Sequence, residues 1–162
     1  MGWVFLIAAL VGCSSDDVVV NDAVNDADSP FGDCGPVATP SLEEARALLI
    51  GTWSYTRESM CTETYRFSGS DEDTPPAADG SYVRNEAQEE WTGLYGLELA
   101  EDGSEMRLRY RVLTDNEMPD CAGVTEDESG ARFVGILSFP SDVQMRLVDP
   151  VDPSICPTFV RN

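Results

Sequence analysis

Residues 91–114, WTGLYGLELAEDGSEMRLRYRVLT, decide the fold of this chain. Asp102-Gly103 at the centre predicts a two-residue hairpin turn, because this dipeptide accepts the backbone angles of such turns. Pairing outward from the turn collects apolar residues on one face: Leu99 with Met106, Leu97 with Leu108, Tyr95 with Tyr110, Gly93 with Val112 and Trp91 with Thr114. A slip of one residue would destroy this partition, so the register is well specified.

The opposite face of the same hairpin carries charge. Arg107, Arg109 and Arg111 alternate along the second strand and pair with Glu98, Gly96 and Leu94. Because this face lies away from the apolar one, we expect it to point outward as a solvated surface. If it lined a cavity instead, it would form an anion or carboxylate site.

Period-two patterns continue on both sides of this hairpin. A second hairpin is predicted with Pro140, Ser141 and Asp142 as its loop, which aligns Phe139 with Val143, Leu137 with Met145 and Gly135 with Leu147. Residues 51–57 and 61–67 form two more alternating runs, and 81–86 and 158–161 form shorter ones. The sequence therefore predicts eight strands between residues 51 and 162.

A short helix precedes these strands. Ser41 and Glu44 form a capping box, which marks the start of a helix. Leu42, Ala45, Leu48 and Leu49 recur at helical spacing and give the helix one apolar face.

Eight sequential antiparallel strands predict an all-β, up-and-down barrel, because closure removes the exposed edges. A two-sheet β-sandwich is the alternative. Four segments resemble the first four strands of lipocalins and of bacterial lipocalin-like domains: Gly51-Thr52-Trp53, Tyr65-Arg66-Phe67, Asp79-Gly80-Ser81-Tyr82 and Trp91-Thr92-Gly93-Leu94-Tyr95. The resemblance implies that Arg161 packs over Trp53 and closes the base of the barrel by a cation-π contact.

The aromatic residues of these strands are candidates for lining a ligand cavity. Such barrels often hold an apolar ligand, and the lining residues would be Trp53, Tyr65, Phe67, Trp91, Tyr95 and Tyr110. An eight-stranded barrel is only just wide enough for its own side chains, however. A filled core is therefore the alternative to a ligand cavity.

The N-terminal segment predicts export. Residues 1–12 are uncharged and mostly apolar, and Leu10-Val11-Gly12-Cys13 resembles the lipobox of bacterial lipoproteins. This resemblance implies cleavage before Cys13, acylation of Cys13 and attachment to a membrane. Ser14 after the cysteine favours the outer membrane of a Gram-negative bacterium.

Residues 13–40 then predict a tether. Residues 14–40 contain six aspartates, three prolines and no cation, a composition that cannot bury enough apolar surface to fold. We therefore divide the chain into a signal peptide at 1–12, a lipidated acidic tether at 13–40 and a lipocalin-like domain at 41–162.

The other four cysteines, Cys34, Cys61, Cys121 and Cys156, predict two disulfides, because an even count is typical of exported domains. Alternating strand directions place Cys61, Cys121 and Cys156 at one end of a barrel. Since the first and last strands are neighbours there, we expect Cys61 to bond Cys156, which leaves Cys34 for Cys121.

Composition excludes several classes of function. The 162 residues include 30 acidic residues and 10 basic ones, all arginine, which gives a net charge of −20. We therefore expect no nucleic-acid partner. Without lysine or histidine, histidine-based nucleophiles and histidine-ligated metals are excluded. We expect no enzyme, metal or cofactor, but an envelope lipoprotein that binds an apolar or amphipathic small molecule, or alternatively a structural or protein-interaction module with a filled barrel.

Overall fold

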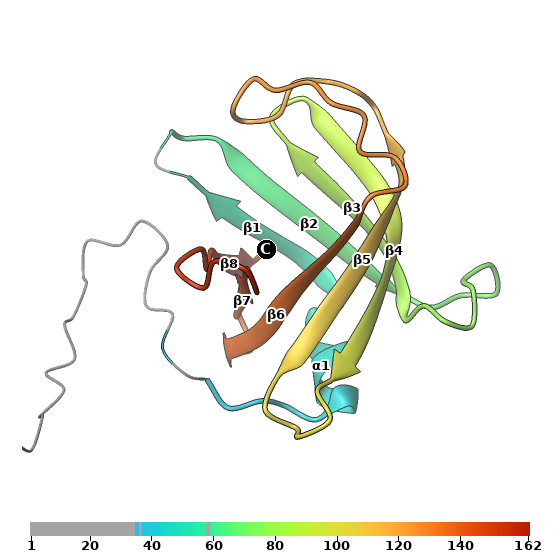
Figure 1. Cartoon of the computed structure of the whole chain (residues 1–162), viewed down its shortest axis with the longest axis vertical. Helices are drawn as coiled ribbons and strands as arrows, with labels where there is room; N and C mark the ends of the chain where they lie inside the picture. Colours follow the sequence, from blue (N-terminus) through green and yellow to red (C-terminus); the bar gives the residue numbers. More distant parts are fainter. Residues whose placement is uncertain (1–34, 36, 58) are drawn as a thin grey trace, which may run out of the picture.

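The computed structural model describes residues 35, 37–57 and 59–162. The predicted signal peptide, lipidation of Cys13, most of the tether and Cys34 lie outside these residues. The described part contains one helix and eight strands (Figure 1): α1 (Leu42–Leu49), β1 (Gly51–Thr56), β2 (Thr62–Gly69), β3 (Gly80–Glu86), β4 (Glu89–Leu99), β5 (Met106–Asp115), β6 (Arg132–Ser141), β7 (Gln144–Val148) and β8 (Thr158–Arg161).

The strands form a closed antiparallel barrel in sequence order. Each strand pairs with the next, and β8 returns to β1 through the register pairs Trp53–Arg161 and Ser54–Val160. The prediction of an up-and-down barrel is confirmed, and the sandwich alternative is wrong, because β1 and β8 meet instead of leaving free edges.

Helix α1 lies at the lower end of the barrel in Figure 1. The predicted capping box is present: the Glu44 amide donates to Ser41 Oγ at 3.3 Å, and the Ser41 amide donates to Glu44 Oε2 at 3.0 Å. Ala45 and Leu49 are fully buried on the barrel side. No helix in the described part of the chain is long and apolar enough to cross a membrane.

The predicted register of the central hairpin is confirmed from Leu99–Met106 to Gly93–Val112. The length of its loop and the partner of Trp91 differ from the prediction. The Ala100 amide pairs with the Glu105 carbonyl at 2.9 Å, which leaves a four-residue loop in which Gly103 has φ +72°. A bulge between Thr92 and Gly93 then pairs Thr92 with Thr114, so Trp91 faces Asp115 instead of Thr114.

The predicted register of the second hairpin is wrong by two residues. Leu137 pairs with Leu147 instead of Met145, because Ser141 pairs with Gln144 and only residues 142 and 143 form the turn. A bulge between Ser138 and Ser141 absorbs the extra length. Since a shift of two keeps every side chain on its face, Leu137 and Met145 still point inward and are buried.

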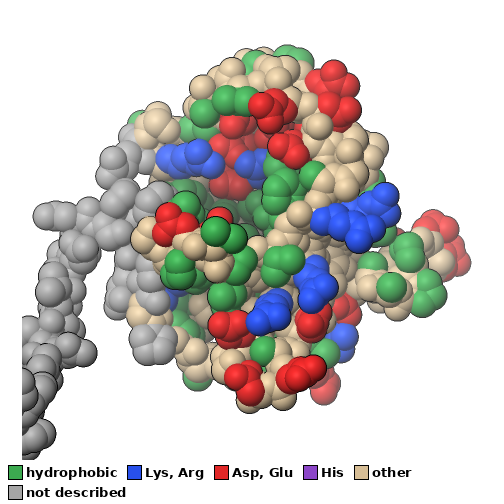
Figure 2. Space-filling view, viewed as in Figure 1, with side chains coloured by type: hydrophobic (Ala, Val, Ile, Leu, Met, Phe, Trp, Pro, Cys, Tyr) green, Lys and Arg blue, Asp and Glu red, His purple; other side chains and the backbone are tan. Residues whose placement is uncertain are grey.

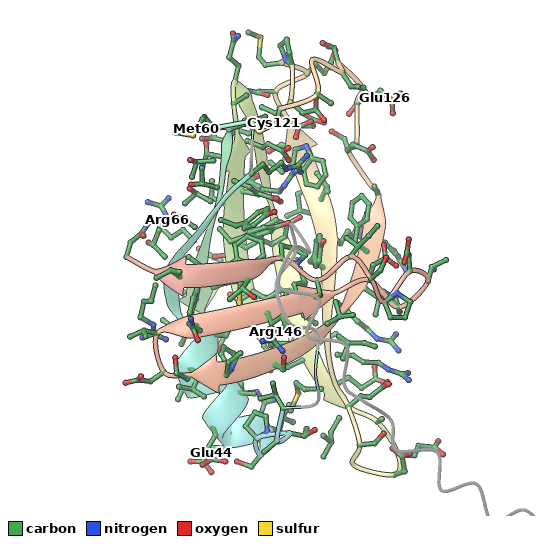
Figure 3. The ribbon with its side chains drawn as sticks, turned by 90° about the vertical axis from the view of Figure 1, so that its left-hand side faces the viewer. Glu44, Met60, Arg66, Cys121, Glu126 and Arg146 are labelled. Carbon is green, nitrogen blue, oxygen red and sulfur yellow. A yellow bond between two sulfur atoms is a disulfide. The ribbon has the colours of Figure 1, made fainter. Side chains whose placement is uncertain are left out.

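The predicted disulfide pairing is also wrong, because Cys61 bonds Cys121, with 5.8 Å between the two Cα atoms. Cys61 lies in the β1–β2 turn, Cys121 in the β5–β6 loop and Cys156 in the β7–β8 loop, and Figure 3 shows Cys121 beside the β1–β2 turn at Met60. Residues 116–131, between β5 and β6, are long enough to cross the barrel mouth. This bond excludes both predicted pairs; Cys156 is itself disulfide-bonded.

Candidate functional site

The six aromatic residues predicted to line a cavity all face the barrel interior. Trp53 is fully buried, while Tyr65, Phe67 and Tyr95 are at most 3% exposed. Trp91 is buried nearer the upper mouth, and Tyr110 is partly buried against the core.

These rings contact one another. Tyr65 stacks on Phe67 with 5.6 Å between the ring centroids, and Phe67 meets Tyr95 edge-on at 5.3 Å. Tyr110 lies edge-on to Tyr65 at 6.3 Å. These separations fall in the range of favourable aromatic pairs. Four of the six predicted cavity-lining residues, Tyr65, Phe67, Tyr95 and Tyr110, are therefore packed together inside the barrel.

Two inward glycines make room for this packing. Gly93 is the cross-strand partner of Tyr82, and a Cβ on Gly93 would lie 2.6 Å from the Tyr82 ring. Gly80 is the partner of Tyr95, and a Cβ there would lie 2.8 Å from that ring. Each tyrosine thus lies across its glycine and occupies space that a side chain would otherwise fill.

The lower end of the barrel is closed around Trp53. The Trp53 indole donates a hydrogen bond from Nε1 to the Leu49 carbonyl at 2.8 Å. The Arg161 guanidinium carbon lies 4.6 Å from the Trp53 ring centroid, and Arg161 also donates to the Leu48 carbonyl. The contact between Trp53 and Arg161 that the lipocalin resemblance implies is present, and it joins β1, β8 and the end of α1.

The upper end contains a cluster of buried ions, which we call the mouth cluster: Arg84, Glu63, Glu86 and Glu89. Arg84 is 8% exposed and forms ion pairs with all three carboxylates, at 2.8 Å to Glu63 and 2.6 Å to Glu89. Its guanidinium carbon lies 4.0 Å from the Trp91 ring centroid. Arg57, more exposed, pairs with Glu86 at 2.8 Å.

Burial and charge set the protonation of this cluster. Burial raises the pKa of Glu89, an effect that its pair with Arg84 only partly opposes. Burial by itself would lower the pKa of Arg84, but the nearby Tyr65, Glu63 and Glu89 outweigh it and the pKa is raised. Burial also raises the pKa of Tyr65 well above its usual value. The mouth therefore holds a permanent cation among three carboxylates, above neutral tyrosines.

A small hollow of about 200 Å³ adjoins the mouth cluster. Arg84, Glu89 and Trp91 line it from the barrel side, and Asp120, Val124, Glu126 and Glu128 line it from the β5–β6 loop. Within the described ranges, no three or more histidine, cysteine, aspartate or glutamate side chains are placed so that they could hold a metal ion. The loop that Cys121 fastens to Cys61 thus forms one wall of this hollow.

The mouth cluster is not among the predicted sites, although the sequence carries a signal for it. Glu63 alternates with Tyr65 and Phe67 on β2, and Arg84 and Glu86 alternate with Tyr82 on β3. All of these positions are buried and share the inward face. Charged residues in phase with buried aromatic ones predict an internal ion cluster, because isolated buried charges are too costly.

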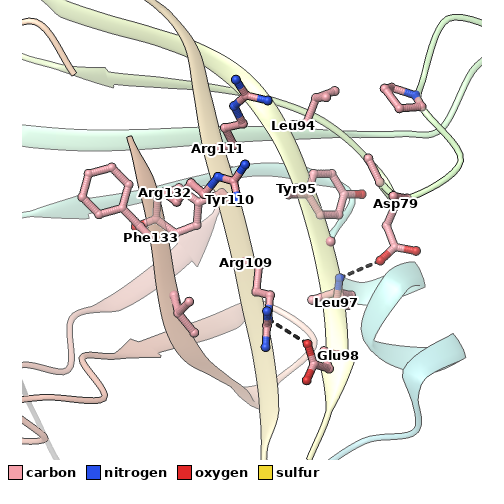
Figure 4. Close-up of a pocket in the computed structure, with 15 residues that line it drawn as sticks. Asp79, Leu94, Tyr95, Leu97, Glu98, Arg109, Tyr110, Arg111, Arg132 and Phe133 are labelled. Carbon is pink, nitrogen blue, oxygen red and sulfur yellow. Dashed lines mark hydrogen bonds and ion pairs between the residues drawn. The ribbon is translucent and has the colours of Figure 1, made fainter. Parts of the chain in front are cut away.

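A second and larger hollow, of about 540 Å³, lies on the outer surface (Figure 4). We call it the outer groove. Its floor is formed by residues of β4, β5 and β6, and Pro75, Ala77, Ala78 and Asp79 of the β2–β3 loop form one wall. Arg109 and Arg111 line it, which confirms that the arginine face of the central hairpin points outward.

No protein-family model, curated protein or solved structure matches this chain.

Proposed function

We propose that this chain is an exported lipoprotein, anchored in the cell envelope by a lipid on Cys13, whose barrel acts through its outer surface as a non-catalytic interaction module. The lipobox-like Leu10-Val11-Gly12-Cys13 supports the anchor, and Ser14 favours the outer membrane of a Gram-negative bacterium. The anchor makes a membrane the first partner of the domain. The high negative charge favours solubility and selects against acidic partners.

The observation that carries this proposal is the packing of the barrel interior. Tyr65, Phe67, Tyr95 and Tyr110 contact one another where a carrier would hold its ligand. Both ends are occupied as well, by the Trp53–Arg161 contact below and by the mouth cluster above. A barrel filled in this way gives stability and presents its outside to partners.

The second candidate is an internal carrier of an apolar or amphipathic small molecule. The hollow beside Trp91 favours it, because this hollow adjoins an indole that lies under the disulfide-fastened loop. However, its volume of about 200 Å³ is smaller than that of typical ligand pockets, which begin near 300 Å³. Its lining is also rich in carboxylates, which suits an apolar ligand poorly.

A catalytic role is not part of the proposal. The chain has neither histidine nor lysine, so carboxylates are its only candidates for a general base near neutral pH. The buried carboxylates of the mouth cluster are all engaged by Arg84. They are arranged to neutralise a buried cation rather than to activate a nucleophile.

The interior is tested with two methionine methyl groups as reporters. Met106 and Met145 are both fully buried inside the barrel. Residues 13–162 carrying Cys13→Ser are titrated with a mixed lipid and fatty-acid extract, and the methyl signals are followed by NMR. We expect the Met106 and Met145 signals to keep their shifts. Saturable shifts of both signals would contradict the proposal and favour the carrier.

The anchor is tested separately by metabolic labelling with a radioactive fatty acid. We expect label on the full chain and none on the Cys13→Ser variant, which should also leave the membrane fraction. Equal labelling of the two would contradict the predicted lipidation.

A further inference from the structure

We propose that the outer groove binds a small amphipathic anion, with its carboxylate or phosphate held by Arg111 and Arg132 and its apolar body against Leu94 and residues 75–78. The inference rests on the proposed function, because that function assigns the activity of the domain to its outer surface. Four observations on this groove carry it.

The first observation is the pairing of Arg111 with Arg132. They are direct cross-strand partners of β5 and β6, and both are exposed on the outer face. Like charges directly opposite each other destabilise a sheet. Among the described residues, neither has an ion pair, although the chain has three acidic residues for each arginine. An anion bound between the two guanidinium groups would remove this repulsion.

The second observation is the local charge of the groove. Arg109, Arg111 and Arg132 line it together with two carboxylates, Asp79 and Glu98. Figure 2 shows arginine side chains over this part of the barrel surface, which is otherwise rich in acidic groups.

Both carboxylates are already engaged. Glu98 pairs with Arg109 at 2.7 Å, while Asp79 pairs with Arg46 at 2.8 Å and accepts the Leu97 amide at 2.6 Å. Counting Arg46, four cations face two carboxylates. The excess of two positive charges belongs to Arg111 and Arg132, whose planar donor groups suit carboxylate and phosphate oxygens.

The third observation is the apolar part of the lining. Leu94 is half-buried, Val134 is 42% exposed, and residues 75–78 add two alanines and a proline that border the groove. The volume of about 540 Å³ lies within the range of small-molecule sites. An inorganic anion would leave most of this volume and all of the apolar lining unused, which favours an anion with an apolar body.

The fourth observation is that the loop wall is fixed in place. The Asp79 amide donates to the Tyr95 carbonyl at 2.8 Å, and Asp79 Oδ2 accepts a hydrogen bond from the Leu97 amide. The loop is thus bonded to β4 through both the backbone and the side chain of Asp79. Gly96 lies beneath it, and a Cβ there would lie 3.7 Å from the Ala77 carbonyl oxygen. A preformed wall lowers the entropic cost of binding.

The test uses residues 13–162 with Cys13→Ser and three ligands that share one alkyl chain. Dodecanoate, dodecyl phosphate and dodecanol are each titrated below their aggregation limits in about 0.1 M salt, where repulsion by distant charges is screened beyond about 10 Å. Affinity is measured by calorimetry, and the Met106 and Met145 methyl signals are recorded in parallel. We expect one site for the anions and at least tenfold weaker binding of dodecanol.

Three variants identify the residues. Arg111→Gln and Arg132→Gln should each weaken binding of the anions by about tenfold or more, as expected for a lost hydrogen bond to a charged group. Arg66→Gln is the matched control, because Arg66 is also exposed on the outer face but does not line the groove. Its affinity should equal that of the parent. Preference for dodecanoate or for dodecyl phosphate would identify which oxyanion the natural ligand carries.

Failure of the inference can be distinguished from failure of the proposed function. Equal affinities for dodecanol and the anions, or anion binding that survives Arg111→Gln with Arg132→Gln, would overturn the groove site. The groove site would also be overturned if none of the three ligands binds and the Met106 and Met145 signals stay unchanged. The proposal of a packed barrel would be unaffected by that result. Saturable shifts of these two signals by any ligand would overturn the proposed function itself.

Discussion

The two ends of the barrel are closed by different interactions. At the lower end, Trp53, Arg161 and helix α1 form a mostly apolar closure with one cation over an indole. At the upper end, Arg84 holds three carboxylates under a loop that the Cys61–Cys121 bond fastens in place. The lower closure depends on packing, whereas the upper one depends on charge balance and on a covalent bond. The two ends should therefore respond differently to substitution, reduction and pH.

The largest expected effect is at the upper end. Arg84→Ala would leave Glu63, Glu86 and Glu89 without their shared cation, and breaking a buried ion pair from one side costs about 3–5 kcal/mol. Urea unfolding at neutral pH measures this loss. Arg66→Ala removes an exposed arginine and should change the free energy of unfolding by less than about 0.5 kcal/mol. An equally small effect of Arg84→Ala would mean that the cluster does not hold the mouth.

Loss of the disulfide should have the second largest effect on the free energy of unfolding. Replacing Cys61 and Cys121 together with serine should lower the free energy of unfolding by about 2–4 kcal/mol, because the bond closes a loop over a sequence separation of 60 residues. Differential scanning calorimetry of the double variant measures the loss. Met60→Ala, which changes an 83% exposed neighbour, is the control. An unchanged melting temperature would show that the β5–β6 loop is not fastened through Cys121.

The lower closure should give a smaller effect. Arg161→Gln removes the cation over Trp53 and the bond to the Leu48 carbonyl, which together contribute about 1–2 kcal/mol. Urea unfolding measures the loss, and the emission of Trp53 should shift because its neighbouring charge is gone. A loss as large as that of Arg84→Ala would contradict the proposed difference between the two ends.

The smallest expected effect is the pH response of Glu89. Its pKa in the folded state is raised above the ordinary value of 4.5, so this group favours folding below that pH and the contribution is lost as pH rises through the folded pKa. Relative to Glu89→Gln, the parent should therefore gain stability as the pH is lowered from 7 towards 4.5. Urea unfolding of both proteins across this range measures the difference. If the parent instead gained stability relative to Glu89→Gln as the pH rises from 4.5 to 7, the assignment would be contradicted.

Much of the fold could be predicted because its signals are local. The hairpin around Asp102-Gly103 fixed its own register through alternation, and Ser41 with Glu44 marked the start of α1. The lower closure could be predicted only through the resemblance to lipocalins, which implies the contact between Trp53 and Arg161; the two residues are register partners of β1 and β8.

The errors concern features that depend on contacts distant in sequence. The Cys61–Cys121 bond depends on how far the β5–β6 loop reaches across the mouth, and strand order does not specify that reach. The bulge before Ser141 could not be predicted either. It shifts the register by two residues, which keeps the same side chains on the inward face, so the alternation of apolar and polar residues does not reveal it. The mouth cluster is the reverse case, because its pattern is visible in the sequence: Glu63 alternates with the aromatic residues of β2, and Arg84 and Glu86 alternate with Tyr82 on β3.

The packed interior is the central claim, and xenon tests it most directly. Xenon enters dry cavities in protein cores, including engineered ones of about 150 Å³. Residues 13–162 with Cys13→Ser are placed under increasing xenon pressure, and the methyl signals of the buried Met106 and Met145 are followed by NMR. The packed barrel predicts no saturable shift of either signal. A saturable shift of both would show a hollow interior and contradict the account.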